Sequence, residues 1–222
     1  MRELVDFLLS RKTGAPLVVA INGIDASGKT TFTGHLRDVL AERGNRVQVI
    51  HLDDYHLPRS LRRACTAPPP ICYYRQTFDW ERFTRLLRSV RQGNLELSET
   101  VLDLETDNYT VECSYEVDAE TIVLAEGVFL LQPDLLSLYD LTIFLEITEE
   151  ECLQRVTRRD GYLFGDEAAI RERYLEKYLP GQALYLAEAN PARVADVVID
   201  NNRPESPYWR VDRTHWRRDP LS

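Results

Sequence analysis

The segment that most constrains this chain is Gly23-Ile24-Asp25-Ala26-Ser27-Gly28-Lys29-Thr30, which fits the pattern G-x-x-x-x-G-K-[ST] in full. An apolar run at residues 17–21 precedes it, and a helical stretch over residues 29–43 follows it. In this context the glycines let backbone N–H groups surround phosphate oxygens, and the helix N-terminus adds its positive dipole end. A glycine turn that matches by chance is the weaker reading, because both flanks agree with the motif. The sequence therefore predicts a buried strand, a phosphate-binding loop and a helix in succession.

The residues of this loop have predicted roles in nucleotide binding. We expect Lys29 to reach the β- and γ-phosphates and the Thr30 hydroxyl to bind Mg²⁺. The predicted nucleotide-binding residues are Gly23, Ile24, Asp25, Ala26, Ser27, Gly28, Lys29, Thr30 and Thr31. Such a loop does not define the reaction, since kinases, GTPases and motor ATPases share it. The chain has neither the N-K-x-D segment of guanine-specific GTPases nor the L-S-G-G-Q signature of transporter ATPases. Phosphoryl transfer to a small molecule is therefore the favoured class.

The rest of the chain alternates strands with helices, which predicts an α/β fold with a parallel sheet and helices on both faces. We expect one domain over residues 1–222, opening with a short amphipathic helix. Residues 57–78 are predicted to be a loop, and residues 95–118 a hairpin arm inserted into the fold. The other expected elements are strands at 47–50, 121–125, 141–145 and 194–199, helices at 80–91, 149–158 and 167–178, a glycine-flanked loop at 160–165 and a break at Pro180-Gly181.

Composition excludes several kinds of partner. The net charge of −9 does not suit a nucleic-acid-binding protein, and no apolar run is long enough to span a membrane. The four scattered cysteines are Cys65, Cys72, Cys113 and Cys152. We expect them to be reduced thiols in a cytoplasmic protein, with disulfides as the lesser alternative. The sequence does not determine the oligomeric state, and a homo-oligomer is one of the alternatives.

Two acidic positions follow predicted strands. Asp53 comes just after the strand at 47–50, where an acceptor hydroxyl would approach the γ-phosphate in an open α/β sheet. A carboxylate there would accept the hydroxyl proton and contribute to the Mg²⁺ site; a turn cap is the alternative. Glu126 ends the strand at 121–125 and is expected to hold Mg²⁺ or its water, or else to cap a turn. His51 and His56 lie close to Asp53 in sequence, which would be compatible with a transition-metal site. We disfavour that interpretation because the ion expected here is Mg²⁺, which needs hard oxygen ligands.

Three arginines, Arg155, Arg158 and Arg159, fall at i, i+3 and i+4 near the end of a predicted helix. Guanidinium groups on one helix face repel each other unless an anion meets them. We expect a lid over residues 155–175 whose arginines close over the phosphates and neutralise charge in the transition state, with Gly161 and Gly165 as the hinge. A solvated helix end is the alternative.

Over most of residues 15–202 the chain resembles the uridine kinase family, within the uridine kinase and phosphoribulokinase group of P-loop kinases. The resemblance rests on Gly23 to Thr31, Asp53-Asp54-Tyr55-His56, Phe78-Asp79-Trp80, Glu126-Gly127-Val128-Phe129-Leu130, Arg155-Val156-Thr157-Arg158-Arg159-Asp160, Tyr178-Leu179-Pro180-Gly181 and Ala195-Asp196-Val197-Val198-Ile199. It implies a P-loop kinase fold and transfer from ATP or GTP to the 5′-hydroxyl of uridine or cytidine. It also implies Asp53 as the base, Thr30 and Glu126 at the Mg²⁺ site and the three arginines in the lid.

The chain departs from that family where the nucleoside would bind. Tyr73-Tyr74-Arg75 stands where the family has an Asp-His-Pro segment whose acid holds the ribose, and Asp103 and Asn108 fall near the family's base-contacting Tyr and His. A nucleoside remains the first expected acceptor, with pantothenate or nicotinamide riboside as alternatives. The residues expected to bind the acceptor are Asp53, Tyr55, His56, Tyr74 and Arg75. The alternative function is a regulatory NTPase that binds a protein partner through the hairpin arm or the tail with Trp209 and Trp216.

Overall fold

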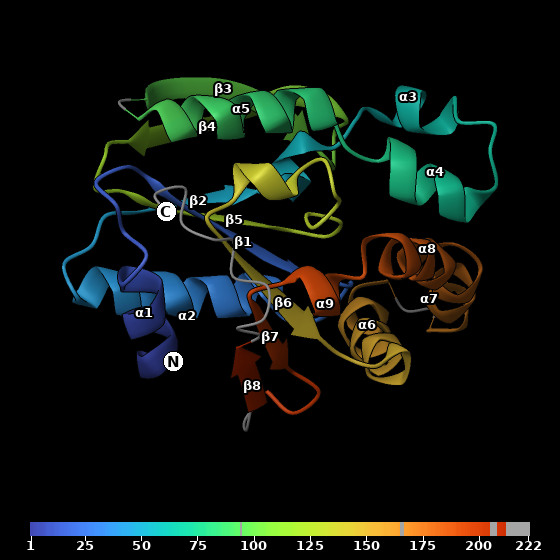
Figure 1. Cartoon of the computed structure of the whole chain (residues 1–222). Coiled ribbons are helices and arrows are strands. Elements are labelled where there is room, and N and C mark those ends of the chain that lie inside the picture. The colour runs from blue at the N-terminus through green and yellow to red at the C-terminus, as the bar shows by residue number, and fades with distance from the viewer. Residues whose placement is uncertain (94, 165–166, 205–207, 212–222) are drawn as a thin grey trace.

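The computed structural model describes residues 1–93, 95–164, 167–204 and 208–211. Its main sheet has six strands in the order β2-β5-β1-β6-β7-β8 (Figure 1). All neighbouring pairs are parallel except β7 with β8. The strands are β1 (Leu17–Gly23), β2 (Val47–His51), β5 (Ile122–Gly127), β6 (Leu141–Glu146), β7 (Val197–Asp200) and β8 (Tyr208–Val211). The prediction of a largely parallel α/β sheet is confirmed.

Helices cover both faces of this sheet, as the alternation along β1 explains. Leu17, Val19 and Ile21 pack in one apolar cluster with α1 (Arg2–Leu9) and α2 (Lys29–Glu42). Val18 and Ala20 point to the opposite cluster, which includes α5 (Trp80–Gln92). Successive side chains of a strand point to opposite faces, so a central strand buried on both sides is apolar throughout. The remaining helical elements are η1 (Leu52–Tyr55), α3 (Arg59–Arg63), α4 (Pro69–Gln76), η2 (Leu136–Leu138), α6 (Glu149–Phe164), α7 (Glu167–Arg173), η3 (Tyr174–Tyr178), α8 (Leu179–Ala189) and α9 (Pro191–Val194).

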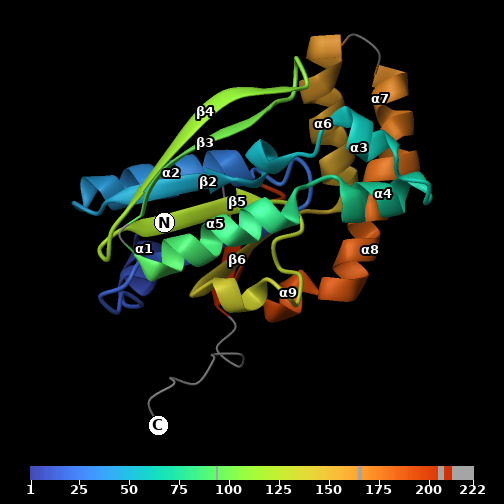
Figure 2. The ribbon, with the colours of Figure 1, turned by 90° about the horizontal axis from the view of Figure 1, so that it is seen from above.

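The predicted hairpin arm is confirmed as a separate two-stranded sheet. β3 (Leu95–Asp103) pairs antiparallel with β4 (Asn108–Val117), and the two form a long ribbon beside the main sheet (Figure 2). Tyr115 and Val117 anchor the ribbon in the same apolar cluster as α5. No helix in the part of the chain that the structure describes is long and apolar enough to cross a membrane.

The predicted loop at 57–78 is wrong, because this segment contains the helices α3 and α4. Its proline run starts α4 rather than breaking the chain. Proline suits the first turn of a helix, where its fixed φ is helical and no N–H is required.

The expectation of four reduced cysteines is wrong for one pair. Cys65 and Cys72 form a disulfide across the turn between α3 and α4, where their Cα atoms are 5.8 Å apart, a separation that suits a disulfide. Cys113 and Cys152 are free.

Three boundaries near the C-terminal half also differ from the prediction. Residues 160–164 belong to α6, so Gly161 is inside a helix and is not part of a loop; residues 165 and 166 lie outside the described part. Pro180 does not break the helical stretch, because it lies in the first turn of α8 directly after η3. Part of the strand predicted at 194–199 is the end of α9, and β7 starts at Val197.

Candidate active site

The phosphate-binding loop joins β1 to α2 and turns sharply. Ala26 and Gly28 have φ of 54° and 90°, in the left-handed region. A Cβ on Gly23 would lie 2.3 Å from the Ser27 hydroxyl oxygen and 2.8 Å from the Leu145 carbonyl oxygen. Glycine is therefore required at residue 23 by close packing, and at residue 28 by backbone conformation. The loop ends at the N-terminus of α2, whose unpaired N–H groups favour an anion.

Two polar side chains at the end of this loop, those of Lys29 and Thr30, donate hydrogen bonds. The Lys29 ammonium donates to the Ile24 carbonyl oxygen at 2.9 Å, so it folds back over the loop. The Thr30 hydroxyl donates to Glu126 Oε1 at 3.0 Å. Glu126 pairs with Ile21 of β1 in register, which brings the end of β5 beside the loop. The parallel pairing of β1 and β5 thus brings together two residues that are far apart in sequence.

The Glu126 carboxylate is buried and only partly satisfied. Its Oε1 also lies 2.6 Å from His51 Nδ1, and this hydrogen bond raises the pKa of His51. Its Oε2 is buried without a hydrogen-bond partner among the described residues. A buried carboxylate oxygen normally has a partner. Together with the Thr30 hydroxyl it offers the hard oxygen ligands that Mg²⁺ prefers, so these residues fit the ion.

Asp53 lies in the short helix η1 at the end of β2, and its side chain is exposed toward the main cavity. Its carbonyl oxygen is 2.8 Å from His56 Nδ1. A carbonyl can only accept, so Nδ1 carries the proton, and burial lowers the pKa of His56 and keeps the ring neutral. The imidazole also packs against the Phe78 ring at 4.5 Å. Asp54 does not line the cavity and instead accepts a weak hydrogen bond from the Cys113 thiol.

The main cavity, of about 490 Å³, brings many of the predicted residues together. Of the residues predicted from sequence, it is lined by Asp25, Ala26, Gly28, Lys29, Thr30, Thr31, Asp53, His56, Arg155 and Arg159. Four further side chains, which the sequence did not indicate as ligands, complete the lining: Tyr73, Phe78, Val128 and Tyr178. The cavity thus joins the phosphate loop to Asp53 and to an aromatic wall.

The predicted residues that lie outside this lining in the part of the chain that is described are eight, namely Gly23, Ile24, Ser27, Tyr55, Tyr74, Arg75, Glu126 and Arg158. Tyr55 is buried, with its hydroxyl 3.2 Å from the Tyr115 hydroxyl. Tyr74 is buried in the core, where its ring lies under the Arg75 guanidinium at 4.3 Å, and Arg75 pairs with Glu188. Arg158 is exposed. Of the two neighbouring tyrosines on α4, Tyr73 lines the cavity and Tyr74 does not, because consecutive residues of a helix point about 100° apart.

Asp25 ties the phosphate loop to two helices. Its carboxylate accepts hydrogen bonds from the Tyr73 hydroxyl at 3.1 Å and from Gln182 Nε2 at 2.8 Å. Burial raises the pKa of Asp25, and the charge of Lys29 opposes that shift. The loop is therefore fixed to α4 and α8 through one carboxylate.

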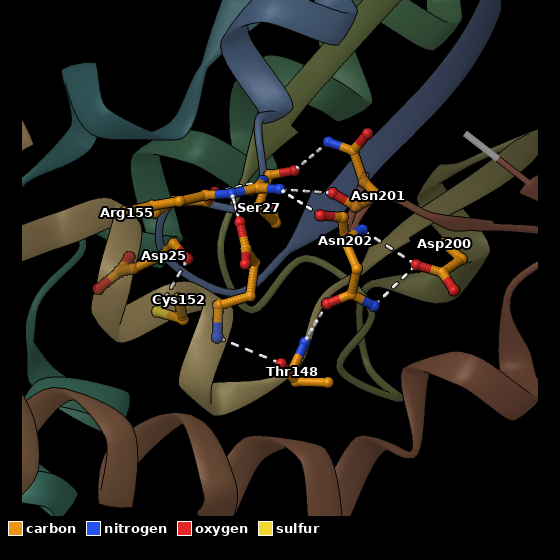
Figure 3. A network of polar contacts seen from close by, with 10 residues as sticks. Asp25, Ser27, Thr148, Cys152, Arg155, Asp200, Asn201 and Asn202 are labelled. Carbon is orange, nitrogen blue, oxygen red and sulfur yellow. Dashed lines mark hydrogen bonds and ion pairs between the residues drawn. The ribbon is translucent and has the colours of Figure 1, made fainter. Parts of the chain in front are cut away.

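Arg155 holds the same loop from the other side (Figure 3). Its guanidinium pairs with Glu151 at 2.7 Å and donates to the carbonyl oxygens of Ala26 at 3.2 Å and Asn201 at 2.7 Å. The Asn201 amide in turn donates to the Ser27 carbonyl oxygen at 2.7 Å. Asn201 had no signal in the sequence beyond its place just after the last parallel strand. Arg155 is thus bonded directly to the loop.

A second cavity, of about 410 Å³, adjoins the loop and shares Ala26, Gly28, Thr31 and Arg155 with the main cavity. Its remaining lining comes from the N-terminus, α1, α2, β7 and the segment after β7, and consists of Met1, Leu4, Phe32, His35, Ile199, Asn201 and Pro204. Apolar side chains with a few polar groups form the kind of lining that small organic ligands occupy.

Comparisons with known proteins agree with this architecture. No family model matches the chain. The uridine kinase of Ureaplasma parvum serovar 3 is 29% identical over 157 residues, 67% of this chain and 70% of that protein. The uridine kinase of Mycoplasma pneumoniae is 28% identical over 187 residues, 82% of this chain and 84% of that protein. A pantothenate kinase from Parvibaculum lavamentivorans is 25% identical over 80% of this chain and 53% of its own length.

Among solved structures, a possible uridine kinase from Bacillus stearothermophilus superposes with a TM-score of 0.70 at 27% identity, covering 89% of this chain and 97% of that one. Phosphoribulokinase from Rhodobacter spheroides shares the fold, with a TM-score of 0.50 at 15% identity over 85% of this chain and 71% of that one. The resemblance to uridine kinase and phosphoribulokinase-like P-loop kinases is confirmed. Fold and relatives together support phosphoryl transfer from a nucleotide to a small molecule.

Proposed function

We propose that this protein is a Mg²⁺-dependent kinase that transfers the terminal phosphoryl group of ATP or GTP to a hydroxyl of a small molecule. The observation that carries the proposal is the main cavity, whose lining includes both the phosphate loop with Lys29 and the carboxylate of Asp53. A kinase needs phosphate-binding groups and a base within reach of one acceptor hydroxyl. The phosphate loop follows β1 and Asp53 follows β2, and both strands end at the same edge of the sheet. This placement supports a reaction in which both groups take part.

The nucleotide would occupy both cavities. Backbone N–H groups of residues 23–31, together with Lys29, would bind its phosphates. The second cavity, with Phe32 and Ile199 in its lining, suits a nucleobase. Arg159 lines the main cavity and would add positive charge at the transferred group.

Thr30 and Glu126 would hold Mg²⁺, supported by the buried Oε2 of Glu126 that has no partner among the described residues. Asp53 lines the same cavity and would face the ion from the acceptor side. When bound, the ion neutralises charge on the phosphates. The role of the protein is to fix these oxygen ligands at the strand ends.

Asp53 would act as the base that accepts the proton of the attacking hydroxyl. Its exposure to the cavity leaves room for an acceptor, and the His56 hydrogen bond to its carbonyl oxygen holds the η1 turn in place. A nucleoside is the acceptor that the names of the uridine kinases suggest. The acceptor end of the cavity favours a different class, for the reasons given in the next subsection.

The test is the variant Asp53→Asn with Asp54→Asn as its matched control. Loss of a general base should lower kcat by about 10²-fold or more, while the KM for ATP changes much less. ADP formation is measured with and without a panel of alcohols. A larger loss in Asp54→Asn than in Asp53→Asn would show that the wrong acid was chosen, and ADP formation that no alcohol stimulates would favour a regulatory NTPase.

A further inference from the structure

A small pocket of about 90 Å³ adjoins the main cavity and takes no part in the nucleotide site described above. His56, Tyr73 and Tyr178 line both spaces. The rest of its lining is Arg62, Cys72, Gln76, Thr77 and Lys177. It contains two cations and, among the residues that the structure describes, no carboxylate. The small pocket is therefore basic, and it adjoins the main cavity in which we place the acceptor.

Arg62 reaches the pocket from α3. Its Nε donates to the Leu57 carbonyl oxygen at 2.8 Å, which fixes the guanidinium. One Nη lies 3.9 Å from the Asp107 carboxylate, too far for a hydrogen bond. That carboxylate already accepts from the backbone N–H of Arg59 at 2.9 and 3.1 Å. The Nη groups of Arg62 consequently retain donors for a ligand.

Lys177 reaches the pocket from η3, the π-helical turn that joins α7 to α8. Such turns widen a helix locally and are frequent at functional sites. The ammonium lies 5.0 Å from the centre of the Tyr178 ring, and no described carboxylate is within ion-pair distance of it. Burial, followed by the charges of Arg62 and Arg173, lowers the pKa of Lys177. Arg62 thus has one long ion pair, with Asp107, and Lys177 has contacts with the Tyr73 and Tyr178 rings but no ion pair among the described residues.

Two cations that face one partly buried pocket disfavour each other's charge, and an anion between them would offset that cost. Asp107 is the carboxylate beside Arg62, at 3.9 Å, whereas Asp25 and Asp53 line the main cavity and not the small pocket. Asp25 is bonded to Tyr73 and Gln182, so it does not neutralise the pair. The residues that face the pocket suit a ligand group with several oxygen acceptors.

We propose that the acceptor is a small alcohol that also carries an anionic group, a carboxylate or a phosphate monoester. The anionic group binds between Arg62 and Lys177 while the hydroxyl reaches Asp53. This inference rests on the proposed kinase function. The pocket, of about 90 Å³, has room for an oxyanion group such as a carboxylate or a phosphate. A neutral nucleoside would leave Lys177 without an ion pair and Arg62 with only its long contact to Asp107.

The first experiment compares alcohols in matched pairs with the wild-type protein, ATP and Mg²⁺. The pairs are D-glycerate with glycerol, pantothenate with pantothenol, and fructose 6-phosphate with fructose, with uridine and cytidine as neutral nucleosides. We expect one anionic member to exceed its neutral partner in kcat/KM by about tenfold or more. The first two pairs test a carboxylate and the third a phosphate. Phosphorylation of neutral alcohols alone would overturn the inference and leave the kinase function intact, and phosphorylation of none would overturn both.

The second experiment locates the anion. Arg62→Gln and Lys177→Gln should each raise the KM for the accepted anionic alcohol by about 10- to 100-fold, with a far smaller effect on its neutral partner. Arg63→Gln and Arg171→Gln are the controls, because both residues are exposed on the neighbouring helical segments and do not line the pocket. Thermal melts check that all four variants fold. Equal KM values in the four variants would overturn the assignment of the pocket.

Discussion

Arg155 provides the sharpest test of how the phosphate loop is held. The sequence predicts that it is a lid arginine, which closes over phosphates only when nucleotide is bound. In the structure its side chain is 17% exposed and is bonded to Glu151, to the carbonyl oxygens of Ala26 and Asn201, and to that of Asn202 at 3.3 Å. We therefore expect Arg155→Ala to destabilise the ligand-free protein.

The size of the effect follows from these bonds. A buried acceptor that loses its donor costs about 1–3 kcal/mol, and water entering from the two adjoining cavities offsets part of that cost. Replacement by alanine should therefore lower the free energy of unfolding by about 3 kcal/mol. In a chain of this length each kcal/mol shifts the Tm by about 2–4 °C, so we expect a fall of about 6–12 °C.

The assay is thermal unfolding of the ligand-free protein followed by near-UV circular dichroism. Arg158→Ala is the matched control, because Arg158 is exposed on the same helix and its loss should change the stability by no more than about 0.5 kcal/mol. A Tm for Arg155→Ala within about 2 °C of the Arg158→Ala value would refute a structural role, since that shift corresponds to less than about 1 kcal/mol. Such a result would restore the reading of Arg155 as a lid residue.

Two further predictions concern the cysteines and Asp25. Because Cys65 and Cys72 are bonded and the other two cysteines are free, thiol titration of the denatured protein should find two thiols before reduction and four after it; four at the outset would contradict the bond. Reduction should also lower the stability by about 2 kcal/mol, the value for so short a loop, measured as the Tm with and without reductant. Burial raises the pKa of Asp25 in the folded state, so the folded protein binds this proton more tightly and its stability falls as pH rises from about 4 through the raised pKa. Asp25→Asn should remove this decrease of stability with pH. The test is urea unfolding of both proteins across this pH range, and identical pH profiles would contradict the argument.

The part of the site proposed to bind the nucleotide, here called the donor half, could be predicted from the sequence because its signals are local. The loop from Gly23 to Thr30 is continuous, and its flanking strand and helix have clear hydrophobic patterns. Asp53 and Glu126 each follow a buried strand, and parallel strands bring their carboxyl ends to one edge. The contact between Thr30 and Glu126 follows from that rule, although the two residues are 96 positions apart.

The part of the site proposed to bind the phosphate acceptor, here called the acceptor half, could not be predicted in the same way. The prolines at the start of α4 suggested a loop, yet proline starts a helix as readily as it ends one. Once α4 forms, Tyr73 faces the cavity, Tyr74 faces the core and Arg75 turns outward to Glu188. A wrong assignment of the helix therefore selected the wrong tyrosine.

The arginine triplet shows a different limit of the sequence. Spacing alone places Arg155, Arg158 and Arg159 on one broad face of a helix. It does not say which part of that face meets the loop. In the structure Arg155 and Arg159, four residues apart, line the main cavity and Arg158 does not, although Arg158 and Arg159 are both exposed. The partner that decides among them, Asn201 with its carbonyl, lies 46 positions away in sequence.

The two halves of the site also differ in how firmly they are held, and this bears on specificity. The phosphate loop is bonded by Asp25 to α4 and α8, and by Arg155 and Asn201 to α6 and the end of β7. Such bonds would hold the proposed phosphate-binding groups in place, and groups held in place lower the cost of ordering a transition state. The basic pocket of Arg62 and Lys177 rests instead on a five-residue helix and one π-helical turn. Changes there can alter the acceptor without disturbing the phosphate loop, so a chain can resemble uridine kinases along its donor half and still phosphorylate an anionic alcohol.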